Sequence, residues 1–112
     1  MYKFNVKEVT IDVSENATQS SSVNTDGMLL TGIVFPATMT GTTVTFDFSV
    51  DGTNFYDVKE TDGTDVSYTV SAGDVVRVDP SGWAFASSGF LKVVSGSTEA
   101  ADRDIKLIFR TA

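Results

Sequence analysis

Apolar residues recur at every second position along most of this 112-residue chain, and this spacing limits the folds open to it. The clearest case is Val44–Val50, where valine and phenylalanine alternate with threonine, aspartate and serine. A period of two places the apolar side chains on one face of an extended strand, whereas a helix needs a period near 3.6. The segment therefore predicts a strand with one face in a core and the other toward solvent.

Alternation marks most of the further strands, and two apolar runs mark the one at 28–35. They are expected at 2–6, 9–13, 28–35, 66–70, 76–78, 91–93 and 105–109. Between Val6 and Val9 the alternation slips by one residue, which predicts a β-bulge or a bend. Asp-Gly pairs at 26–27, 51–52 and 62–63 and the prolines Pro36 and Pro80 supply the turns between strands.

No segment keeps a helical period over three turns, and the one candidate, Ser97–Arg103, is too short to form a stable helix. The pattern therefore predicts an all-β fold, in which residues 1–112 form a single antiparallel β-sandwich of about eight strands. A jelly-roll-like sandwich is the favoured topology, and an immunoglobulin-like sandwich is the alternative, because alternation does not reveal the order of the strands.

Two residue types are absent, and this narrows the possible chemistry. The chain has no cysteine and no histidine, so it offers no thiolate nucleophile or ligand and no imidazole base. We expect no enzymatic activity and no cofactor, and a small-molecule ligand is not expected. The acids around Asp62 and Asp65 could offer oxygen ligands to calcium, but turn formation and solvation are their expected roles.

Negative charge is concentrated in the middle of the chain. Residues 26–79 contain nine acids and two bases, which equals the net charge of −7 of the whole chain. An acidic surface repels phosphate groups, so nucleic-acid binding is not expected, and no apolar run is long enough for a membrane span or a signal peptide. An exposed acidic tip is predicted from five side chains. They are Asp51, Asp57, Glu60, Asp62 and Asp65.

Some strands also carry apolar residues on the face that should point away from the core. A two-layer sandwich covers only one face of each sheet, so these residues must be covered by the chain's own loops or by another chain. Trp83 could anchor the core or an interface, or stack on a sugar ring. The candidate interface comprises Leu29, Ile33, Phe35, Trp83, Phe90, Val94 and Ile108, with the basic residues Lys3, Lys7, Lys106 and Arg110.

The order of these segments resembles that of small all-β virion proteins of tailed bacteriophages. The likeness lies in a polar segment at 20–23 leading to a strand that ends at Pro36, and in the hairpin Val44–Val58. It continues through Gly82-Trp83, Phe90–Gly96 and Ala101–Leu107. Together these stretches cover about residues 18–110, nearly the whole chain.

The resemblance implies a structural role without catalytic residues. Such proteins look like head decoration (cement) proteins, which bind the major capsid protein of an assembled head, often as trimers. It implies synthesis in the cytoplasm of a bacterial host and a final location on the head surface of the virion. A carbohydrate- or receptor-binding module of a fibre, and a tail or baseplate protein, are the alternatives.

Overall fold

The computed structural model describes all 112 residues and contains nine strands and one short 3-10 helix. The strands are β1 (Phe4–Ile11), β2 (Val23–Asn24), β3 (Met28–Val34), β4 (Thr43–Ser49), β5 (Tyr56–Asp57), β6 (Ser67–Thr69), β7 (Val75–Arg77), β8 (Phe90–Ser95) and β9 (Arg103–Thr111). The helix η1 (Pro80–Ala86) lies between β7 and β8.

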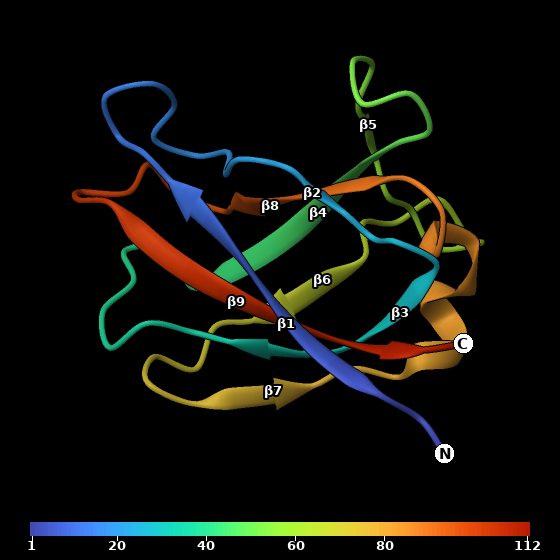
Figure 1. Cartoon of the computed structure of the whole chain (residues 1–112). Helices are drawn as coiled ribbons and strands as arrows, with labels where there is room; N and C mark the ends of the chain where they lie inside the picture. Colours follow the sequence, from blue (N-terminus) through green and yellow to red (C-terminus); the bar gives the residue numbers. More distant parts are fainter.

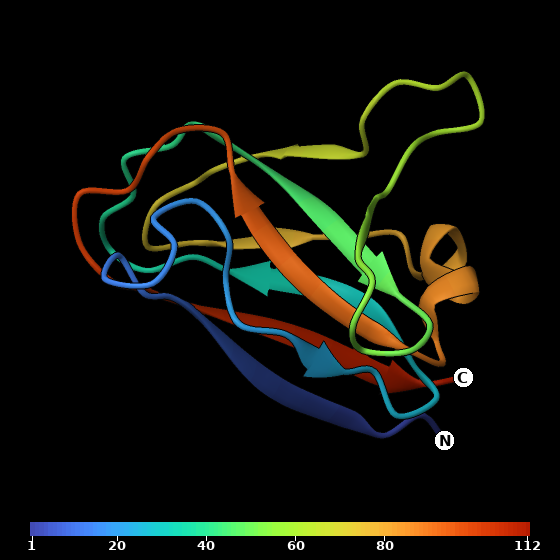
Figure 2. The ribbon, with the colours of Figure 1, turned by 90° about the horizontal axis from the view of Figure 1, so that it is seen from above.

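The strands form two antiparallel sheets that pack face to face (Figures 1 and 2). One sheet has four strands in the order β1-β9-β3-β7, and we call it sheet A. The other, sheet B, has five strands in the order β2-β8-β4-β5, and β6 pairs with β4 beside β5. The fold is therefore a β-sandwich, as the alternation predicted.

The pairing of strands is nested. β1 pairs with β9, β2 with β8, β3 with β7 and β4 with β6, so the chain resembles one long hairpin whose two halves run side by side. Rolling this hairpin brings β9 beside β3 and β8 beside β4, which closes the two sheets. This interleaved order is that of a jelly roll, so the favoured topology is confirmed. The immunoglobulin-like alternative is wrong, because there the first two strands are neighbours in one sheet.

A bulge in β3 determines which of its apolar residues enter the core. Leu30 pairs with Phe109, but the next paired residue is Gly32, opposite Ile108, so Thr31 is the extra residue. The bulge shifts the alternation, and as a result Leu30 and Ile33 are both almost completely buried. The core cluster comprises Val9, Ile11, Leu30, Ile33, Phe35, Val44, Phe46, Val58, Val78, Trp83, Ala86, Leu91, Val93, Ile105, Leu107 and Phe109.

The bulge predicted between Val6 and Val9 is not present. β1 pairs with β9 without interruption from Phe4 opposite Arg110 to Ile11 opposite Arg103. The apolar residues simply change sides of a regular strand. Val9 faces the core, whereas Phe4 and Val6 face outward and remain 65% and 55% exposed.

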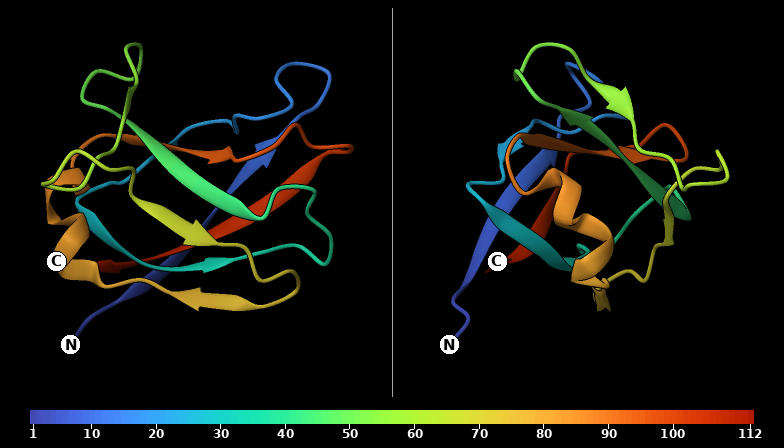
Figure 3. Two further views of the ribbon diagram at one scale, coloured as in Figure 1. Left: turned by 180° about the vertical axis from the view of Figure 1, so that it is seen from behind. Right: turned by 90° about the vertical axis from the view of Figure 1, so that its right-hand side faces the viewer.

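The helix η1 closes one end of the sandwich (Figure 3). Asp79 caps it by accepting a hydrogen bond from the backbone N–H of Ser81, and Pro80 occupies its first turn. Sequence reasoning expected a turn here and placed its only helical candidate at Ser97–Arg103, which is a loop followed by the start of β9. No helix of the chain has the length and hydropathy to cross a membrane.

Candidate interaction surfaces

The outer face of sheet A carries apolar side chains with no covering element. Phe4 and Val6 from β1 are joined there by Ile108 from β9, Val34 from β3 and Val75 from β7. Val6 lies opposite Ile108, and Val75 lies opposite Val34, so the residues form adjacent rows across the sheet. Ile108 and Val34 are half-buried and Val75 is 57% exposed. A surface of this kind is typical of a site that another protein covers.

Three basic residues lie on the same face. Lys106 and Arg110 belong to β9, and Arg77 belongs to β7. Arg110 lies over the ring of Tyr2 at 4.0 Å from the ring centre, and Lys106 is paired across the strands with Glu8. Glu8 and Asp104 lie on this face too, so it is apolar with three bases beside two acids, in a chain with a net charge of −7.

Four residues of the predicted interface are not available to a partner. Leu29, Ile33, Phe35 and Trp83 each expose 9% or less of their surface within the single chain. The bulge in β3 explains this for Ile33 and Phe35, since it turns both into the core. Trp83 is held against the core by η1, with its ring centre 4.8 Å from that of Phe46. The prediction that these four await another chain is wrong.

The other apolar residues of the predicted interface do not form one patch. Ile108 lies on the outer face of sheet A, whereas Phe90 and Val94 lie on the outer face of sheet B. Phe90 is partly covered by the turn after β4. Gly52 of this turn lies so close that an added Cβ would be 3.1 Å from the Phe90 ring. The two sheets face in opposite directions, so a single flat partner does not contact both sets.

The four basic residues of the predicted interface also differ in how far they are exposed to a partner protein. Lys7 forms an ion pair with Asp26 and donates a hydrogen bond to the carbonyl of Asn24 at 2.6 Å, which ties β1 to the turn before β3. Lys3 and Lys106 are exposed, and Arg110 is half-buried. Lys7 therefore has an internal partner, while Lys106 and Arg110 are placed on the apolar face of sheet A.

The five acids of the predicted tip lie on the segment between β4 and β6, which projects from the sandwich (Figure 1). Asp51 accepts hydrogen bonds from the backbone N–H groups of Thr53 and Asn54 at 2.8 and 2.9 Å, and these bonds hold its pKa far below the usual range. Hydrogen bonds from Thr64 likewise lower the pKa of Asp62. Both carboxylates build turns.

Two further acids of the tip flank a lysine. Lys59 forms an ion pair with Asp65 and lies 4.0 Å from Asp57, and the hydrogen bond to Asp65 raises the pKa of Lys59. Glu60 is exposed. No group of three carboxylates in the chain is arranged to hold a metal ion. The segment is an acidic, solvated projection whose side chains mostly fold it locally.

Asp57 also lies opposite Asp47 of β4. Burial of Asp47, its hydrogen bond to Asp57 and the nearby charge of that residue raise the pKa of Asp47 to about 6, while Lys92 opposes the rise. Asp47 is paired with Lys92 across the strands and exposes 7% of its surface. Alternation alone placed Asp47 on a solvent face, and only the segment folded over that face buries it.

Sequence reasoning missed a buried carboxylate at the opposite end of the sandwich from η1. Glu99 accepts hydrogen bonds from the backbone N–H groups of Thr40 and Gly41 and from the hydroxyl of Ser95, each at 2.7–2.8 Å, and it pairs with Arg103. Burial alone would raise the pKa of Glu99, but these hydrogen bonds together lower it to about 2. The backbone donors lie about 60 residues earlier in the chain, so no local sequence signal marked this carboxylate.

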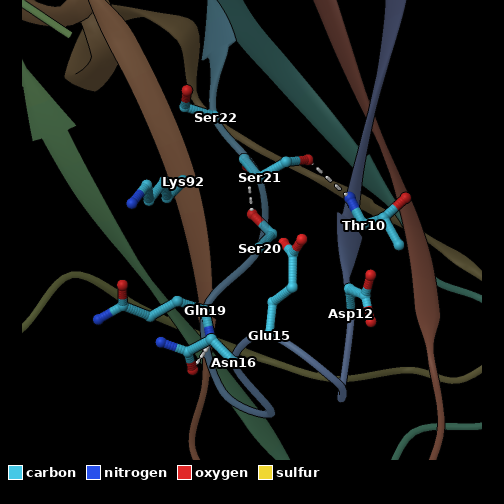
Figure 4. A pocket seen from close by; sticks show the side chains of 9 residues that line it. All are labelled: Thr10, Asp12, Glu15, Asn16, Gln19, Ser20, Ser21, Ser22 and Lys92. Atoms are coloured by element: carbon cyan, nitrogen blue, oxygen red, sulfur yellow. Dashed lines mark hydrogen bonds between the residues drawn. The ribbon is translucent and has the colours of Figure 1, made fainter. Parts of the chain in front are cut away.

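A polar pocket of about 470 Å³ opens beside the loop that follows β1 (Figure 4). No hydrophobic residue lines it. The side chains of Gln19 and Lys92 point to one side of this region, away from Asp12, and the Lys92 ammonium lies 4.2 Å from the ring centre of Phe55. Ser21 accepts a hydrogen bond from the N–H of Thr10 at 3.1 Å. The lining is completed by Asp12, Glu15, Asn16, Ser20 and Ser22. Such mixed donors and acceptors suit a hydroxylated ligand better than an apolar one.

The comparisons with known proteins concern the fold. The sequence matches no protein-family model and no curated protein. Among solved structures, the chain is similar to the SPBc2 prophage-derived protein YomS, with a TM-score of 0.58 and 8% sequence identity. The alignment covers 99% of this chain and 96% of that one, so the two share the architecture of the whole domain.

Proposed function

We propose that this chain is a structural protein of a bacteriophage virion, and specifically a decoration protein that binds the outside of an assembled head. The observation that carries the proposal is the uncovered, mainly apolar outer face of sheet A. Phe4, Val6 and Val75 are each more than half exposed on it, an arrangement suited to contact with another protein. The absence of cysteine and histidine agrees with a role that requires binding and not chemistry.

Two likenesses support a phage origin. The order of sequence segments resembles that of small phage virion proteins, and the architecture is shared with a prophage-derived protein over nearly the full length of both chains. Together with the exposed face they favour a structural role in the particle. The head location is part of the same proposal, whereas the trimer is an expectation of the resemblance alone.

The orientation on the head follows from the charge distribution. The acidic projection between β4 and β6 and the two chain termini lie on different sides of the sandwich (Figures 1 and 2). In the proposed orientation the face with Lys106 and Arg110 meets the major capsid protein, and the projection with Glu60 points into solvent. An acidic outer surface keeps the decorated particles soluble.

Photo-crosslinking to heads of the phage that encodes the chain tests this orientation. A photoreactive residue at Val75 should crosslink to the major capsid protein, and one at Glu60 should not. Lys106→Glu combined with Arg110→Glu should reduce cosedimentation with heads, whereas Glu60→Lys should leave it unchanged. Crosslinks from Glu60 alone would reverse the orientation, and cryo-electron microscopy that places the chain on the tail would overturn the head assignment.

A specific observation favours a second function, the binding of a host-surface glycan by a fibre module. The pocket in Figure 4 is lined only by polar residues, among them Gln19 and Glu15, whose side-chain amide and carboxylate could bond sugar hydroxyls. A glycan array followed by an NMR titration tests it. Gln19→Ala and Lys92→Ala should abolish any binding, and Ser97→Ala, an exposed serine outside the pocket, should not. An array without binders would leave only the structural role.

A further inference from the structure

The first half of β1 is an open sheet edge. β1 stands at the end of sheet A and pairs only with β9. Lys3 exchanges hydrogen bonds with Thr111 of β9, through its N–H to the Thr111 hydroxyl at 3.1 Å and through its carbonyl from the Thr111 N–H at 2.8 Å. Backbone groups alternate in direction along an antiparallel strand. Phe4, Val6 and Glu8 therefore direct their N–H and C=O groups away from β9, where no residue of the chain accepts or donates.

The second half of the same edge is covered. Thr10 has the same orientation as Phe4, Val6 and Glu8, and its N–H and C=O bond to the hydroxyl and the N–H of Ser21, at 3.1 and 2.9 Å. The other edge strands are short, with two residues in β2 and β5 and three in β6 and β7. Short or covered edges are the usual protection against pairing with another chain. The segment Phe4–Glu8 has neither protection.

We infer that this edge pairs with the same edge of a second copy of the chain, about a two-fold axis at Val6. In this antiparallel register Val6 faces Val6 of the other copy, and Phe4 faces Glu8 of the other copy. All three residues with free backbone groups then form hydrogen-bonded pairs, each exchanging two N–H···O bonds. The pairing ends at Thr10, where Ser21 already occupies the edge, so the register uses the whole open segment and nothing beyond it.

The side chains on the outer face fit this register. Val6 is flanked by Ile108 within each copy, so the axis is crossed by one apolar row of valines and isoleucines. In the next row Lys106, Glu8, the second copy's Phe4 and its Arg110 follow one another. No like charges lie opposite each other, and Glu8 stands between basic residues of both copies. Cross-strand pairs of this composition stabilise a sheet.

Other registers fit less well. A two-fold axis at Glu8 sets two carboxylates opposite each other and brings Val6 against the Thr10 that Ser21 covers. An axis at Lys7 brings Phe4 against the Thr10 that Ser21 covers, and an axis at Phe4 leaves Glu8 unpaired. An axis at Asn5 pairs Glu8 with Tyr2, which lies outside β1. The geometry therefore selects a closed pair of chains, in place of the trimer that the family resemblance favours. The pairing joins the two apolar faces of sheet A into one surface, and it holds whether or not the chain binds a head.

The test is the mass of the full chain in solution, measured by light scattering over a concentration series. A short edge buries little area, so we expect weak association. The mass of the wild type should therefore rise toward twice the 12.0 kDa of one chain only as the concentration reaches the micromolar range. Val6→Lys should keep the single-chain mass, because it opposes two ammonium groups at the axis. Val75→Lys is the matched control, since Val75 is 57% exposed against 55% for Val6 and lies on the opposite edge of the same face. It should still dimerise.

Two further measurements separate a lost interface from a lost fold. Val6→Lys and Val6→Glu, each monomeric alone, should form a dimer when mixed, because opposite charges then meet at the axis. In hydrogen exchange, the amides of Phe4, Val6 and Glu8 should become protected as the concentration rises, while those of Asn5 and Lys7 should be protected throughout. A single-chain mass at millimolar concentration, a trimer, or a dimer unaffected by Val6→Lys would overturn the inference.

Discussion

The carboxylate of Glu99 lies 2.8 Å from the Nε of Arg103, and this pair closes the end of the sandwich opposite η1. Glu99 also accepts hydrogen bonds from the loop before β4, so one side chain joins three segments. We expect Glu99→Ala to lower the free energy of unfolding by about 3–5 kcal/mol, because it leaves buried donors and Arg103 without a partner. Chemical denaturation measures this, and Glu60→Ala should change the value by less than about 0.5 kcal/mol.

The contribution of Glu99 to the stability of the fold should depend on pH. The pKa of Glu99 is lowered from 4.5 to about 2 in the folded chain, so the folded state favours the ionised form. The stabilisation is complete above the unfolded pKa, and it is lost as the pH falls from about 4.5 to 2. The difference in Tm between the wild type and Glu99→Gln should therefore shrink over this range. A difference that stays constant from pH 7 to pH 2 would contradict the assignment.

Asp47 should have the opposite dependence on pH. Its pKa is raised to about 6 from 3.8, so the folded state binds the proton more tightly and stability falls as the pH rises from about 4 to 6. Asp47→Asn removes the cost of a buried charge, and we expect it to stabilise the chain at pH 7.5 by about 1 kcal/mol and by little at pH 4. Thermal unfolding at the two pH values measures this. Asp65→Asn, on the exposed projection, is the control and should lack this pH-dependent gain.

Gly89 should not tolerate a side chain. A Cβ at Gly89 would lie 2.5 Å from both the ring of Phe48 and the carbonyl oxygen of Ser49, and backbone at that distance must move. We expect Gly89→Ala to destabilise the chain by about 1–3 kcal/mol, as overpacking of a core does. Gly82→Ala is the matched control, since nothing lies within 4 Å of its Cβ. Equal stability of the two variants would show that β8 adjusts freely.

Trp83 and Tyr68 should be coupled. The indole N–H of Trp83 donates to the hydroxyl of Tyr68 at 2.9 Å, and Trp83 exposes only 3% of its surface. Tyr68→Phe should cost about 1–2 kcal/mol, because it leaves the buried donor without an acceptor. In a double-mutant cycle, the variant that carries both Tyr68→Phe and Trp83→Phe should lose less stability than the two single variants lose in total. Full additivity would mean that water satisfies the indole N–H.

Much of the architecture was predictable, because alternation is a local property. Val44–Val50 was predicted as a strand with one buried face. β4 forms there with Val44 and Phe46 buried, but Asp47 and Ser49 on the opposite face are buried as well, and Val50 lies beyond the strand and is 78% exposed. The local turn-forming roles of Asp51 and Asp62 were also predictable, since Asp-Gly pairs form turns without distant partners. The order of the strands was favoured by the sequence but not established by it, because it depends on contacts between distant segments.

The candidate surface was harder to predict, because exposure is decided by what packs against a residue. Ile33 and Phe35 looked like second-face residues, but the bulge at Thr31 turned them inward. The predicted bulge between Val6 and Val9 would have kept the apolar residues on both sides of it on one face, but β1 is regular and leaves Phe4 and Val6 outside. Glu99 was hidden because its donors come from residues about 60 positions earlier in the chain.

The sequence alone therefore determined a single all-β sandwich, without cysteine or histidine chemistry, and with its acids in the middle of the chain. Periodicity depends on neighbouring residues and composition on none, so both can be read from the sequence without knowledge of distant contacts. Only the tertiary structure decided which apolar face stays uncovered and which edge stays unpaired. The rolled hairpin brings the two ends of the chain together in sheet A, and Ser21 covers only half of β1. Those long-range contacts leave Phe4–Glu8 open to a partner.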